Sequence, residues 1–179
     1  MAKPKDRQAE QALHPEQSYE SAMRELIARR WAAVWVAVPA ALAGEDIEGV
    51  HDVRVASRRL RAAMDVAVEC FSSDWYGPLH RVAKEITGAL GEVRDRDVMI
   101  EYLTRDRAKA DPLEHPGFDL LIARMERERV VARAGMEAYL HSLLAGGVPK
   151  EVSGRFGPAA LPPGMVVDAS NERTREAVA

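Results

Sequence analysis

One stretch of eleven residues, from His51 to Arg61, combines a histidine with four arginines. At roughly 100° per residue, most of these basic groups project from one side of a helix, opposite the apolar residues of the same stretch. The groups that share this side are His51, Arg54, Arg58 and Arg61. The nearest balancing acids are Asp52 and, one turn beyond Arg61, Asp65. Because arginine keeps its charge and pairs its guanidinium with phosphate or carboxylate oxygens, the pattern indicates an anion-binding helix face.

The overall composition shows that this basic character is local. The 179 residues carry a net charge of −3 with a pI near 6.0, unlike a general nucleic-acid-binding protein. A hydrophobic content of 47% is typical of one globular domain. The single cysteine, Cys70, has no disulfide partner in the chain, which favours a cytoplasmic setting. The apolar run from Trp31 to Ala43 is about thirteen residues, too short to span a bilayer, so we expect no membrane association.

Apolar residues recur at helical spacing along most of the chain. This spacing predicts helices over residues 17–43 and 47–71, a third from Trp75 through Leu90, a further run over 94–107, and a last helix over 118–144. Prolines, glycines and polar residues predict a flexible leader over 1–16 and a flexible tail over 146–179. A single helical domain over 17–145 lies between them.

The short links between long amphipathic helices predict an all-α fold, an antiparallel four-helix bundle. The third helix adds basic residues on one side, at His80, Arg81 and Lys84. Gly88 and Gly91 follow them and leave the backbone open to close approach.

The familiar signatures of nucleotide, zinc and acyl-transfer chemistry are absent from the sequence. It contains no GxGxxG, P-loop, HExxH, CxxC or GxSxG pattern. We therefore predict no catalytic residue, no metal ligand and no cofactor.

Two motifs point to a known family. The first is His51-x-x-Arg54-Val55-x-x-Arg58-Arg59-Leu60-Arg61, and the second is Leu90-Gly91-x-Val93-Arg94-Asp95-x-Asp97-Val98. In this order and separation, they resemble the CHAD domain, the conserved histidine α-helical domain, over about residues 18–145. The resemblance implies a helical bundle that binds inorganic polyphosphate on a basic surface, in some cases on polyphosphate granules.

The resemblance also implies which residues meet the ligand. By motif match these are His51, Arg54, Arg58, Arg59, Arg61 and Arg94. Lys84, His80 and Arg81 join them by their place on the third helix. A CHAD domain usually has two related halves, whereas nothing after Gly146 repeats the first motif. The chain is therefore truncated, a short family member, or a protomer that completes its site in a homodimer.

Other charged residues have simpler interpretations. Asp95 and Asp97 point to different sides of a helix, so we expect them to hold arginines in place rather than to share a metal ion. Arg59 lies off the basic side and suits an internal salt bridge as well as a ligand contact. In the last helix, arginines alternate with glutamates as on a solvated face, although one or two could line the site. These are Arg124, Arg127, Arg129 and Arg133.

Three other functions compete with a non-catalytic polyphosphate-binding module. A nucleic-acid or nucleotide binder would use the same arginines, but the net charge and the lack of interleaved aromatic residues disfavour it. An enzyme acting on phosphoanhydrides would need clustered acids for magnesium, which the basic helix lacks. A helical module that binds an acidic protein segment is the third.

Overall fold

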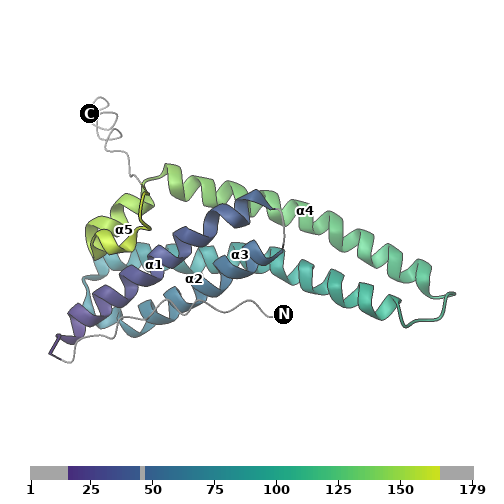
Figure 1. The fold of residues 1–179 in the computed structure, drawn as a ribbon, viewed down its shortest axis with the longest axis horizontal. Helices are drawn as coiled ribbons and strands as arrows, with labels where there is room; N and C mark the ends of the chain where they lie inside the picture. The colour runs from purple at the N-terminus through teal and green to yellow at the C-terminus, as the bar shows by residue number, and fades with distance from the viewer. Residues whose placement is uncertain (1–15, 45–46, 166–179) are drawn as a thin grey trace.

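The computed structural model describes residues 16–44 and 47–165, and the regular elements within these ranges are all helical. The long helices are α1 (Tyr19–Ala43), α2 (Glu48–Val66), α3 (Ser73–Arg107) and α4 (His115–Ala145) (Figure 1). The short ones are α5 (Val148–Phe156) and the 3₁₀ helices η1 (Val68–Cys70) and η2 (Pro158–Ala160). The predicted all-α class is confirmed. The predicted leader falls outside these ranges, except for Glu16.

Packing follows the chain order. Helix α2 packs against α1 and α3, and α3 packs against α4. As residue numbers rise along one helix, the residues that they contact on the next helix have falling numbers. Helices α2 and α3 are therefore antiparallel, and so are α3 and α4. In Figure 1, the end of α3 and the start of α4 extend past α1 and α2 as a two-helix hairpin.

Helix α1 begins where the Ser18 hydroxyl accepts a hydrogen bond from the Ser21 amide at 3.2 Å, and ends at Gly44, whose φ is 68°. It is long and apolar enough, by length and composition alone, to cross a membrane. The apolar run of about thirteen residues identified in the sequence therefore underestimates the length of the apolar helix. A core helix meets the same criteria. In this fold the Trp31 and Trp35 rings stack 5.4 Å apart and are buried in the core.

Helix α3 differs from its prediction. The runs predicted on either side of Gly91 form one continuous helix of 35 residues. An interior glycine costs only about 1 kcal/mol relative to alanine. Burial of an apolar stripe that continues from Leu79 through Leu90 to Val93 offsets that cost.

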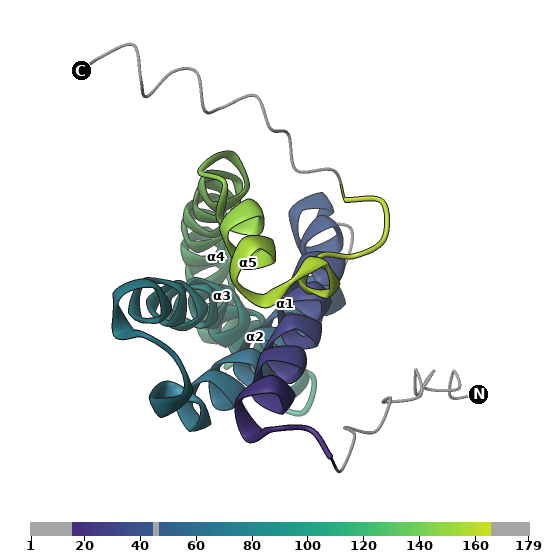
Figure 2. The same cartoon turned by 90° about the vertical axis from the view of Figure 1, so that its left-hand side faces the viewer.

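The predicted flexible tail is wrong over residues 148–160, where α5 and η2 form and pack against α1. The predicted count of four helices is therefore also wrong, because a fifth lies beside α1 and α4 (Figure 2). The prolines and glycines of this segment led to the error, yet a proline such as Pro149 is favourable in the first turn of a helix. Val152 and Phe156, one turn apart, supply the buried side.

Candidate anion-binding site

The basic residues of α2 lie at the surface on the side that faces α3. His51 and Arg54 are half-buried, and Arg58 and Arg61 are exposed. The opposite side of α2 is anchored by Val53 and Leu60, which are fully buried. The amphipathic pattern predicted for this helix is confirmed, and the core holds its basic side outward.

Three contacts set the register between α2 and α3. Asp65 meets His80, the Thr87 hydroxyl donates to the buried Ser57 hydroxyl at 3.3 Å, and Arg54 lies against Gly91. In this register Arg61 is level with Lys84 and His51 is level with Arg94. We call the surface formed along the two helices the basic seam; its residues are His51, Arg54, Arg58, Arg61, Lys84 and Arg94. From His51 to Arg61 it extends about 15 Å at 1.5 Å per residue.

Gly91 and Gly88 differ in what surrounds them. A side-chain Cβ at Gly91 would lie 2.7 Å from Nη1 of Arg54, so the missing side chain makes room for that guanidinium. At Gly88 nothing lies within 4 Å of the corresponding position. The sequence predicts that other groups come close to the backbone at both glycines, and of the two only Gly91 has such a neighbour.

Arg94 contributes a guanidinium from the other side of the seam. It is half-buried, and its Nη1 is buried with no hydrogen-bond partner. A buried donor without a partner carries a cost of about 1–3 kcal/mol, which a bound anion would remove. Among the residues that the structure describes, Arg54, Arg58 and Lys84 likewise have no ion pair.

One end of the seam is neutralised. Asp65 Oδ1 lies 2.7 Å from His80 Nε2, and its Oδ2 lies 3.6 Å from Arg61 Nε. The His80 side chain is only 12% exposed and its ring packs 5.9 Å from that of Tyr76. His80 therefore contacts the core and Asp65, and the structure does not place it among the open cations. The sequence places Asp65 one turn beyond Arg61, but only the fold shows that it also contacts His80.

Two further predicted residues lie beside the seam rather than in it. Arg81 is exposed, one position past His80, and Arg59 is exposed on α2. At about 100° per residue, Arg59 points well away from its neighbour Arg58. Within residues 16–44 and 47–165, Arg59 forms no ion pair, so the internal salt bridge considered for it is not formed there.

The arginines of α4 are mostly engaged by neighbouring groups. Arg124 pairs with Glu128 at 2.9 Å and Arg133 with Glu137 at 2.7 Å. Arg133 also donates to the carbonyl of Ala41 at 2.9 Å, which ties α4 to the end of α1. Arg129 pairs with Asp97 at 2.5 Å. The prediction that Asp97 holds an arginine is confirmed, although the arginine comes from α4.

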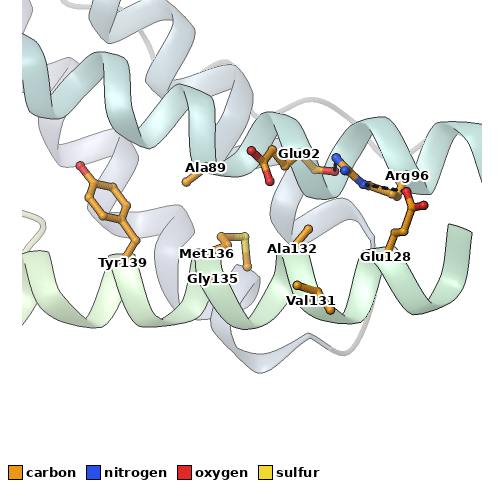
Figure 3. Close-up of a pocket in the computed structure, with 9 residues that line it drawn as sticks. All are labelled: Ala89, Glu92, Arg96, Glu128, Val131, Ala132, Gly135, Met136 and Tyr139. Atoms are coloured by element: carbon orange, nitrogen blue, oxygen red, sulfur yellow. Dashed lines mark hydrogen bonds and ion pairs between the residues drawn. The ribbon is translucent and has the colours of Figure 1, made fainter.

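A separate groove of about 630 Å³ lies between α3 and α4 (Figure 3). The Tyr139 hydroxyl at one end donates to Glu85 at 3.0 Å, and burial together with this bond raises the pKa of Tyr139. None of the predicted anion-binding residues lines the groove, so it is distinct from the basic seam. Its lining consists of Ala89, Glu92, Arg96, Glu128, Val131, Ala132, Gly135, Met136 and Tyr139.

Comparison with known proteins agrees with the helical fold and its two motifs. The family model of the CHAD domain matches residues 25–177, and the chain belongs to the CHAD domain family. The match includes α5, so the unit extends past residue 145, the end of the region over which the two motifs predict it. CHAD domains are associated with the binding of polyphosphate and triphosphate. No curated protein and no solved structure gives a significant match to the chain.

Proposed function

We propose that this protein binds inorganic polyphosphate along the basic seam and does not catalyse a reaction on it. The observation that carries the proposal is the α2–α3 register, which makes one surface from cations of two helices. Polyphosphate repeats one negative charge per internal phosphate, so a row of arginines about 15 Å long suits several successive phosphates. The unpartnered Nη1 of Arg94 supports an anion at this place.

The chemistry of the seam favours binding over catalysis. Phosphoryl transfer generally needs carboxylates that hold magnesium beside the reacting phosphate. Asp65, an acid in contact with the seam, is already engaged by His80 and Arg61. Incubation with polyphosphate and magnesium should therefore release no phosphate, and sustained release would contradict the non-catalytic assignment.

Calorimetry with long-chain polyphosphate tests the proposal. The Arg54→Ala/Arg58→Ala variant should bind at least about 100-fold more weakly, because it loses two charge-assisted contacts. Its matched control is Arg124→Ala/Arg127→Ala, which removes the same charge from α4 and should bind within about threefold of the wild type. Higher salt should weaken binding by the wild type, because bound phosphates release counterions.

The outcomes separate the competing functions. Equal loss in both variants would mean that net charge, and not the seam, drives binding. Displacement of polyphosphate by single-stranded DNA at equal phosphate concentration would favour the nucleic-acid interpretation. Displacement by polyglutamate would favour an acidic protein partner. No binding by the folded wild type would overturn the proposal.

A further inference from the structure

We infer that Gly91 is a positioning residue of the basic seam, which seats the Arg54 guanidinium against α3 by having no side chain. The inference rests on the proposed polyphosphate function and extends it to a residue that carries no charge and touches no ligand.

The space beside Gly91 is occupied by the guanidinium of Arg54. Gly91 is buried inside α3, where an alanine would be the better helix former. The atoms within 4 Å of a Cβ placed there are Nη1 and Cζ of Arg54, at 2.7 and 3.8 Å. No backbone atom of another helix is that close, so an added methyl would displace the end of a flexible side chain rather than a neighbouring helix.

Two arginines, Arg54 and Arg94, lie near Gly91. Arg94 lies one turn along α3 from Gly91, with its Nη1 buried and unpartnered. Arg54 and Arg94 thus bring two guanidinium groups toward the same part of the seam, and neither has an ion pair within the described residues. Like charges held this way repel each other unless an anion lies between them. Holding Arg54 in place beforehand lowers the entropy that phosphate binding must overcome.

Gly88 provides a matched control. It lies on the same helix, one turn before Gly91, and a Cβ there would meet nothing within 4 Å. Alanine at either position should favour the helix to a similar degree. The Gly91→Ala and Gly88→Ala variants therefore share the backbone effect and differ in the contact with Arg54.

A double-mutant cycle with long-chain polyphosphate tests the inference. Gly91→Ala should weaken binding by about tenfold with a smaller salt dependence, and Gly88→Ala should stay within about twofold of the wild type. In an Arg54→Ala background, Gly91→Ala should cause no more than about a twofold further change. The two glycine variants should melt at or above the wild-type temperature.

Each other outcome overturns the inference. If the wild type does not bind polyphosphate, the proposed function fails and the inference fails with it. If the wild type binds and Gly91→Ala binds equally well, the inference fails alone. It also fails if Gly91→Ala is equally harmful without Arg54, or if it lowers the melting temperature while Gly88→Ala does not, because Gly91 would then act through packing.

Discussion

At the scale of single residues, the role of a charged side chain depends on where the fold places it. Asp97 is buried, with 5% of its surface exposed, and its Oδ1 accepts a hydrogen bond from Arg129 Nε at 2.5 Å. Asp95, two positions earlier, is exposed. The pair Asp97–Arg129 joins α3 to α4.

Removing Asp97 should destabilise the fold, because it leaves the partly buried Arg129 without its partner. We expect Asp97→Ala to lower the free energy of unfolding by about 1.5–3 kcal/mol. Asp95→Ala removes the same charge from an exposed site and should change it by less than about 0.5 kcal/mol. Urea denaturation monitored by circular dichroism measures the two, and equal effects would contradict a role for the buried pair.

At the scale of elements, α5 is joined to the body through aromatic packing. The ring of Phe156 lies 5.9 Å from that of Phe71 and 5.5 Å from that of Trp75, both edge to face. Arg155 stacks over Trp75 at 5.2 Å, and Arg24 of α1 donates to the Arg155 carbonyl at 2.5 Å. Helix α5 therefore covers the end of the core near α1 and the start of α3.

We expect Phe156→Ala to lower the free energy of unfolding by about 3–5 kcal/mol, because it leaves a cavity among these rings. The exposed Glu151→Ala on the same helix serves as the control and should have little effect. Thermal melts compare them. A Phe156→Ala variant as stable as the control would mean that α5 contributes little to the fold.

At the scale of the whole molecule, the end of α3 and the start of α4 extend past α1 and α2 as a hairpin (Figure 1), and these two helices carry exposed apolar side chains. Exposed fractions are 45% for Met99, 49% for Tyr102, 68% for Leu120 and 47% for Leu121. Patches of this kind mark interaction surfaces, and a stable interface buries about 800 Å² per partner. The ion pairs on the hairpin, such as Arg107–Asp119, balance its charge, so two copies could meet there without strong repulsion.

We therefore expect a homodimer through the hairpin, which a two-fold axis would make from the same patch on each copy. Sedimentation equilibrium should give twice the monomer mass at micromolar concentration. Leu120→Glu/Leu121→Glu should give the monomer, and Val36→Glu, which alters an exposed valine of α1, should not. A wild type that stays monomeric up to about 100 μM would contradict this prediction.

The sequence alone determined the local features of this protein. Helical periodicity depends on neighbours within one turn or two, so the all-α class and helix ends such as Ala43 and Arg107 followed from it, although α2 ends at Val66 rather than at the predicted residue 71. The basic side of α2 did too, because one helix sets the spacing of His51, Arg54 and Arg58. Helix α5 was missed because the apolar side it buries is short and becomes evident only against the rings of Phe71 and Trp75.

Only the tertiary structure decided which residues meet across helices. Register depends on packing between segments far apart in the chain, and no local pattern encodes it. The packing of the helices placed Arg54 against Gly91 but nothing against Gly88, and it brought Asp65 into contact with His80. The sequence thus supplied the cations, and the packing of α2 on α3 selected the ones that form a common surface.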